Sequence, residues 1–193
     1  MQLNALQEQA SACRLNRRTF IKGQLAVLAA LAIPAPALAL SRPSPRERAL
    51  SFYNIHTGER LKNAIYWANG DYVDETLDDI SFLMRDFRRN EVGAIDPELL
   101  DQVFSLRRAV GANNPVHIIS GYRSPATNEM LARQSGGVAR RSFHMDGRAV
   151  DLRIPGCDLQ TVRRAAINMQ RGGVGFYPRS DFVHIDTGPV RSW

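Results

Sequence analysis

The pattern of apolar residues changes its period near Asp74, and this change most constrains what the chain can fold into. Before it, residues 50–56 and 60–67 show the alternation and the β-favouring residues of two strands. They lie on either side of the turn signal Thr57-Gly58-Glu59, which predicts a β-hairpin. After it, apolar residues between 77 and 87 recur at spacings of three and four, which predicts one face of a helix.

Helical and extended segments continue to alternate irregularly along the rest of the chain. Asp96-Pro97-Glu98 predicts a helix start, because Asp caps helices, Pro is tolerated at the first helical position and an acid suits the first turn. This mixture favours an α+β fold over repeated βαβ units, so we expect one domain with a small antiparallel β-sheet and flanking helices. The predicted helices are 74–87, 97–110, 125–133 and 159–171, and the later strands are 115–120, 148–154, 173–177 and 182–186.

The first 39 residues carry the pattern of an export signal. Arg17-Arg18 precedes an apolar run that closes with Ala37-Leu38-Ala39, and the arginine pair is typical of the twin-arginine route. Two prolines interrupt the run, and its apolar part is shorter than the ~20 residues that span a bilayer, so we expect no stable membrane span after cleavage. An uncleaved anchor is the alternative. The predicted organisation is a signal peptide at 1–39, a linker at 40–48 and a domain at 49–193, exported to the periplasm.

Composition narrows the possible partners of the exported domain. Hydrophobic residues make up 44% of the chain and charged residues 23%, which is ordinary for a globular protein and argues against disorder. Half of the formal net charge of +6 lies in residues 1–39, which hold four basic residues against Glu8, so the remainder carries +3. No block of Lys and Arg with interleaved aromatics occurs, so we expect no nucleic-acid binding. Cys157 is the only cysteine after residue 39, which excludes an internal disulfide.

Three residues in the second half have the spacing of a metal site. His144 ends a loop, and Asp151 follows seven residues later on a predicted strand, with a glycine at the bend. His184 lies on a strand near the end of the chain, and an adjacent antiparallel strand can place it beside Asp151. Two imidazoles and one carboxylate, with a fourth position left for water, are the ligands of a catalytic zinc ion. Zinc-bound water and a polarised carbonyl are what amide hydrolysis requires.

Two acids flank His184 and are candidates for the general base. Asp186 lies two residues after it, so both side chains share a strand face. Asp181 lies three residues before it and has the opposite parity, unless the strand starts after it. Spacing leaves the choice open, and Asp186 is also a candidate for orienting the imidazole.

Residues 142–151, Ser-x-His-x-x-Gly-x-Ala-x-Asp, resemble the zinc-ligand motif of the family of zinc D-Ala-D-Ala carboxypeptidases and L-alanoyl-D-glutamate endopeptidases, which has the hedgehog-type fold. Within it the chain looks most like the murein endopeptidase K (YcbK-like) branch. The resemblance covers about residues 49–193. It is carried by that motif together with Asn54-x-His56-Thr57-Gly58-Glu59, Ser120-Gly121-Tyr122-Arg123-Ser124, residues 173–178 and Phe182-Val183-His184-Ile185-Asp186.

The resemblance implies roles for individual residues. His144, Asp151 and His184 look like the zinc ligands. Asp181 matches the position of the family's catalytic acid, as Asp where some relatives have Glu. Relatives with a His-x-His pair have a base at the position that is Phe182 here, so that base is absent. The substrate contacts implied by the resemblance are Arg123, for a carboxylate or carbonyl, and Ser142.

We therefore expect a zinc-dependent metallopeptidase that hydrolyses peptide cross-links of peptidoglycan and binds its stem peptides. Two alternatives remain open: a D-Ala-D-Ala carboxypeptidase that trims stem peptides, and a non-catalytic metal-binding module that recognises the wall. A base within reach of the zinc water distinguishes an enzyme from the module. We expect structural roles for His56, for His117 as a core histidine, and for Cys157 as a small apolar residue.

Overall fold

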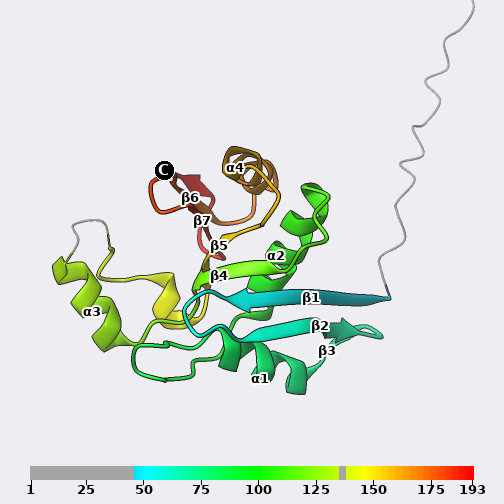
Figure 1. The fold of residues 1–193 in the computed structure, drawn as a ribbon, viewed down its shortest axis with the longest axis horizontal. Coiled ribbons are helices and arrows are strands. Elements are labelled where there is room, and N and C mark those ends of the chain that lie inside the picture. The colour runs from blue at the N-terminus through cyan, green and yellow to red at the C-terminus, as the bar shows by residue number, and fades with distance from the viewer. Residues whose placement is uncertain (1–45, 135–137) are drawn as a thin grey trace, which may run out of the picture. The chain divides into compact units, whose positions relative to one another are not determined.

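One mixed β-sheet organises the part of the chain that the structure describes, residues 46–134 and 138–193 of a computed structural model (Figure 1). These described residues belong to one compact unit. The sheet has eight strands in the order β3-β2-β1-β4-β5-β7-β6-β8. Their bounds are β1 Glu47–Asn54, β2 Arg60–Ala68, β3 Asp71–Tyr72, β4 Val116–Ser120, β5 Ala149–Arg153, β6 Gly173–Tyr177, β7 Phe182–Asp186 and β8 Arg191–Ser192.

The sheet is neither small nor purely antiparallel, which corrects the expected architecture while the α+β class is confirmed. The hairpin of β1 and β2 forms as predicted, but β1 also pairs in parallel with β4. The chain passes through two helices between these strands, and such a crossover can return it in the same direction. A second parallel pair joins β6 to β8. Local alternation shows where strands are but not which strands become neighbours, so neither parallel pairing could be predicted from it.

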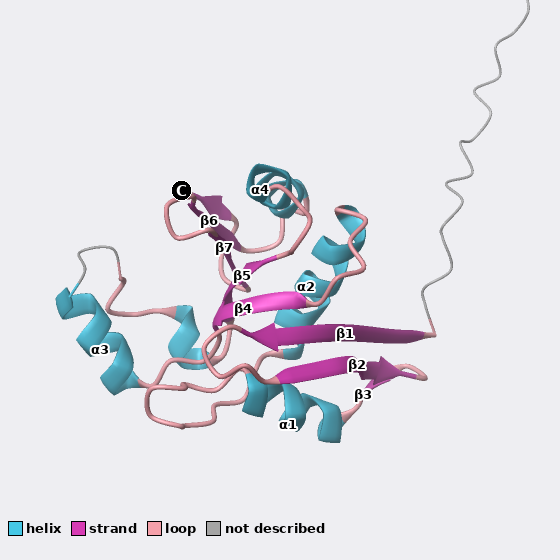
Figure 2. Cartoon of the chain, viewed as in Figure 1, coloured by secondary structure: helices cyan, strands magenta, loops and turns pink. Residues whose placement is uncertain are grey.

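Four α-helices and one short 3₁₀-helix complete the described fold (Figure 2). Asp96 caps α2 by accepting a hydrogen bond from the Glu98 amide, as its sequence predicts. The first and last helices are shorter than expected, because Met84 and Met169 act as their C-caps. The helices are α1 Asp74–Leu83, α2 Pro97–Ala109, α3 Pro125–Gln134, η1 Phe143–Asp146 and α4 Leu159–Asn168.

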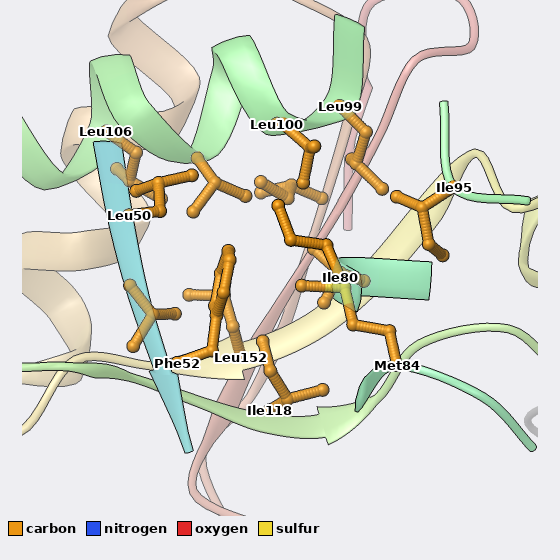
Figure 3. Close-up of a cluster of buried hydrophobic side chains, with 14 of the residues drawn as sticks. Leu50, Phe52, Ile80, Met84, Ile95, Leu99, Leu100, Leu106, Ile118 and Leu152 are labelled. Carbon is orange, nitrogen blue, oxygen red and sulfur yellow. The ribbon is translucent and has the colours of Figure 1, made fainter. Parts of the chain in front are cut away.

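The hydrophobic core lies on one face of the sheet, against α1, α2 and α4. Figure 3 shows side chains of β1, β4 and β5 meeting those of α1 and α2 in this core. Phe52, Ile118 and Leu152, from β1, β4 and β5, are at most 1% exposed and pack against side chains from the helices. Side chains alternate along a strand, so the residues on either side of Leu152 point to the opposite face. Asp151 is therefore on the face opposite α1, α2 and α4.

The boundaries expected at the N-terminus are only partly within the described residues. β1 begins at Glu47, so the last two residues of the expected linker at 40–48 belong to a strand. The strand pairs with β2 up to Ala68, which gives these residues a defined position in the sheet. The predicted signal peptide at 1–39 lies outside the described residues.

Candidate metal centre

The sheet register brings the two strand-borne ligands together. Asp151 on β5 and His184 on β7 are direct partners in the antiparallel pair, as the sequence predicted. His144 reaches the same place from η1, whose N-cap is Ser142. The chain then turns at Gly147, where φ is +66° and an added Cβ would collide with the Ala94 carbonyl. Glycine is therefore required between the first ligand and the second.

Three ligand atoms converge within bonding range of a single ion. His144 Nε2 lies 3.2 Å from Asp151 Oδ1 and 3.2 Å from His184 Nδ1. His184 Nδ1 is 2.8 Å from the same carboxylate oxygen. All three side chains are buried. Within the described residues, they form a group whose ligand atoms lie close enough together to hold a metal ion.

The outer atoms of both imidazoles fix which nitrogen faces the centre. His144 Nδ1 lies 2.7 Å from the Gly121 carbonyl oxygen, which can only accept, so this nitrogen carries a proton. His184 Nε2 lies 3.1 Å from an Asp186 oxygen and donates to it. In the neutral rings the two inner nitrogens therefore carry lone pairs and face the Asp151 carboxylate. Three lone-pair donors this close repel one another unless a cation or proton lies between them, so the residues fit a zinc ion.

Burial and charge favour the protonation states that metal ligation needs at His144 and Asp151, but not at His184. Burial, the largest influence, lowers the pKa of His144 and favours its neutral form. Burial alone would raise the pKa of Asp151, but His144, His184 and Arg123 hold it below its usual range. Burial opposes charge on His184 too, yet Asp151 and Asp186 raise its pKa. Without metal, a proton on His184 can thus satisfy the centre, and metal binding would displace it.

Asp186 holds His184 in place from behind. It is fully buried, and besides the His184 ring it accepts hydrogen bonds from the amides of Gly173 at 3.0 Å and Gly188 at 2.8 Å. The guanidinium of Arg191 on β8 donates to the same carboxylate at 2.7 Å. Its acceptor positions are thus occupied, which makes Asp186 an orienting residue and not a base. The shared strand face predicted for Asp186 and His184 is confirmed.

Arg123 supports the carboxylate ligand in the same way. Its guanidinium pairs with Asp151 Oδ2, the oxygen that does not face the histidines, and its Nε donates to Ser120 Oγ at 2.8 Å. Its backbone amide also donates to the His144 carbonyl at 3.1 Å. These contacts fix the position of Asp151, and the substrate contact expected for Arg123 from the sequence stays a prediction.

A cavity of about 260 Å³ opens over the three ligands. Trp193 forms part of its wall, 5.4 Å from the His184 ring between centroids, and donates to the Tyr177 hydroxyl at 2.9 Å. Ser142 lines the cavity as expected. The remaining wall combines aromatic rings and arginines, namely Phe143, Phe182, Arg123, Arg141 and Arg191. Sequence reasoning missed Tyr177, Arg191 and Trp193, because only the pairing of β6 with β7 and β8 brings them here.

The structure does not bring Asp181 to the ligands. It lies on the turn before β7 with φ at +53°, and its side chain is 62% exposed. Its carboxylate pairs with the Arg153 guanidinium at 2.7 Å and does not line the cavity. Its assignment as base therefore stays a prediction.

Comparison with known proteins places this arrangement in a family. A family model described as peptidoglycan L,D-endopeptidase MepK matches residues 42–193. The peptidoglycan L,D-endopeptidase MepK of Escherichia coli K12 is 45% identical over 178 residues, covering 92% of this chain and 97% of that protein. A probable MepK of Haemophilus influenzae is 44% identical over 151 residues, covering 78% and 81%.

Among solved structures, the L-Ala D-Glu endopeptidase ChiX of Serratia marcescens is similar at 19% identity and a TM-score of 0.37, covering 57% of this chain and 86% of that one. The family model and the curated relatives cover nearly the whole domain at high identity. They confirm the expected enzyme class, a murein endopeptidase, and the chain belongs to the family of peptidoglycan L,D-endopeptidases MepK.

Proposed function

We propose that this chain is a zinc-dependent endopeptidase that hydrolyses L,D cross-links between the stem peptides of peptidoglycan. One observation carries the proposal: three lone-pair ligand atoms, 2.8–3.2 Å apart, lie beneath a cavity in a member of the MepK family. The L,D linkage is taken from the names of the relatives.

His144 Nε2, Asp151 Oδ1 and His184 Nδ1 are the atoms that would hold the zinc ion. When bound, zinc lowers the pKa of its water to about 7 and polarises the scissile carbonyl. The Gly121 carbonyl and Asp186 keep the two imidazoles in the ligating tautomer, and Arg123 keeps the inner oxygen of Asp151 directed at the centre. This support allows the ligands to bind without rearrangement.

Asp181 is our candidate for the general base. It immediately precedes Phe182, which lines the cavity, and its exposed side chain is held by one ion pair. An exposed ion pair contributes little free energy, about 0–1 kcal/mol, so the carboxylate can leave Arg153 at small cost. Asp186 is a poor alternative, because moving it would break four interactions in a buried site. In the proposed reaction Asp181 accepts the proton of the attacking water and later returns it to the leaving amine.

The lining of the cavity suits an anionic peptide. Arg141 is a candidate contact for a substrate carboxylate, and Arg123 and Ser142 keep their proposed role as substrate contacts from the cavity wall. The aromatic side chains, including Trp193, offer flat apolar surface to the peptide.

Export by the twin-arginine route to the periplasm, with cleavage after Ala39, is part of the same proposal. It is supported by the pattern of residues 1–39 and by the location of peptidoglycan outside the inner membrane. Within residues 46–134 and 138–193, no helix has the length and apolarity to cross a membrane. Replacing Arg17 and Arg18 by lysine should leave the chain in the cytoplasmic fraction, and unchanged export would contradict the route.

Digestion of purified, cross-linked peptidoglycan tests the proposed activity. Mass spectrometry should show loss of L,D-linked dimers while D,D-linked dimers persist. A chelator should stop the loss and added zinc should restore it. Release of terminal D-Ala alone would indicate the carboxypeptidase, and no product from zinc-loaded protein would favour the non-catalytic module.

A further inference from the structure

Four side chains form a row across the face of the sheet opposite α1, α2 and α4, beside the metal centre. Arg60 on β2, Tyr53 on β1, His117 on β4 and Arg153 on β5 are successive register partners. The Arg60 guanidinium lies over the Tyr53 ring, 4.3 Å from its centroid, and the Tyr53 ring meets His117 edge-on at 5.0 Å. We call these four residues the cross-sheet row.

Strand alternation places the cross-sheet row on the same face as the metal ligands. Phe52, Ile118 and Leu152, its sequence neighbours, belong to the core beneath the helices. Arg153 lies two residues after the ligand Asp151 on the same strand, so both side chains point the same way. The row therefore begins at Arg153, two residues along β5 from Asp151, and continues from the metal centre across the sheet.

Two groups in the row lack partners among the described residues: the Arg60 guanidinium has no carboxylate partner, and His117 Nδ1 has no hydrogen-bond partner. Arg60 is exposed, and it makes no ion pair with a carboxylate among the described residues. The His117 Nδ1 atom is buried and has no hydrogen-bond partner in the described part of the chain. The expectation that His117 is a satisfied core histidine is therefore wrong, because it is half-buried and lies on the face opposite α1, α2 and α4.

Charge along the row favours an anionic partner. Burial chiefly, and then the nearby Arg153 and Arg60, lower the pKa of His117, so its ring is neutral at neutral pH. Two guanidinium groups thus flank two uncharged rings, and Asp181 offsets the charge at the Arg153 end only. Carboxylates can bind the arginines, and planar amide groups can lie on the rings between them.

We propose that the cross-sheet row binds a carboxylate-bearing stem peptide of peptidoglycan where it continues beyond the scissile bond. This inference rests on the proposed function and extends its substrate site from the cavity across β5, β4 and β1. Its support is the continuity of the row with the metal centre and the complementarity of free arginine charge to peptide carboxylates.

Sedimentation with purified, insoluble cross-linked peptidoglycan tests the row separately from catalysis. All proteins are the full chain with His184→Ala, which removes a ligand and prevents turnover. Adding Arg60→Glu should weaken binding about tenfold and Arg60→Gln about threefold, as expected for reversing or removing one contact charge. Arg164→Glu is the matched control, because this exposed arginine lies on α4, on the helix-covered side. It should bind like the parent.

A second arm identifies the group that is recognised. Peptidoglycan with its peptide carboxyls converted to amides should bind the parent as weakly as native peptidoglycan binds the Arg60→Glu protein. Equal binding by Arg60→Glu, Arg60→Gln and Arg164→Glu, or undiminished binding to the amidated polymer, would overturn the inference. Neither result depends on turnover, so failure of the proposed activity is detected separately by digestion with the unmodified chain.

Discussion

The two ends of β7 carry acids with opposite surroundings, although both flank the same histidine. Asp186, at the end of the strand, is fully buried and bonded to the His184 ring, two backbone amides and Arg191. Asp181, before the strand, is 62% exposed and pairs with Arg153 alone. The difference teaches that proximity in sequence does not assign a catalytic role. The acid with many partners is fixed as support, and the acid with one partner stays the candidate base.

Asp186→Ala should have the largest effect on the molecule. The His184 ring and two backbone amides would lose their acceptor in a buried place, which costs about 3–5 kcal/mol in the free energy of unfolding, at about 1–3 kcal/mol for each unsatisfied group. Zinc affinity should fall about 10–100-fold as the His184 ring loses its orientation. Chemical denaturation and a competitive zinc titration measure the two effects. Unchanged stability would remove Asp186 from the supporting role.

Asp181→Asn should affect activity without affecting the fold. Loss of the proposed base should lower kcat on cross-linked peptidoglycan about 10²-fold or more. The free energy of unfolding should change by no more than about 0.5 kcal/mol, because an exposed ion pair is lost. The control is Glu129→Gln, which breaks another exposed pair, with Arg133 on α3. If both variants keep full activity, a different base operates.

Acid should weaken the support that Asp186 gives at the end of β7. The bonds to His184, Arg191 and the Gly188 and Gly173 amides outweigh burial and hold the pKa of Asp186 below its usual range. Its stabilising contribution is therefore present above the unfolded pKa of about 3.9 and is lost as pH falls through the lower folded pKa. The difference in stability between the parent and Asp186→Asn should narrow below about pH 4 in acid denaturation curves. A constant difference down to pH 2 would contradict this origin.

The arginine partners should give the smallest effects. Arg191→Gln leaves the buried Asp186 with its other bonds, and Arg191 is itself 41% exposed, so we expect a loss of about 1 kcal/mol. Arg153→Gln, which touches the exposed Asp181, should change stability by less than about 0.5 kcal/mol. Thermal unfolding of both variants measures the two losses of stability. A larger loss in Arg153→Gln than in Arg191→Gln would contradict the account.

The sequence predicted that His144, Asp151 and His184 would meet, because their positions depend on local features. The Gly147 turn and the pairing of β5 with β7 follow from a glycine and two short apolar runs. The supporting residues were harder to find. Arg191 lies on a two-residue strand without alternation, and Trp193 directly follows that strand. Both reach the site only through the parallel pairing of β6 with β8.

The role of Arg123 was also beyond the sequence. A guanidinium near a substrate cavity suits a substrate carboxylate and a ligand carboxylate equally, and its contact with Asp151 appears only in the structure. Asp181 illustrates the same limit for a turn. Its left-handed backbone directs the side chain towards Arg153, a direction that strand parity could not predict.

Metal content tests the central claim most directly. The purified chain, dialysed against trace zinc, should hold about one zinc ion per chain, and X-ray absorption should show two nitrogen ligands and one carboxylate oxygen beside water. His144→Ala, Asp151→Ala and His184→Ala proteins that remain folded should each lose the ion. A folded parent that binds no zinc, or zinc retained in all three variants, would contradict the account.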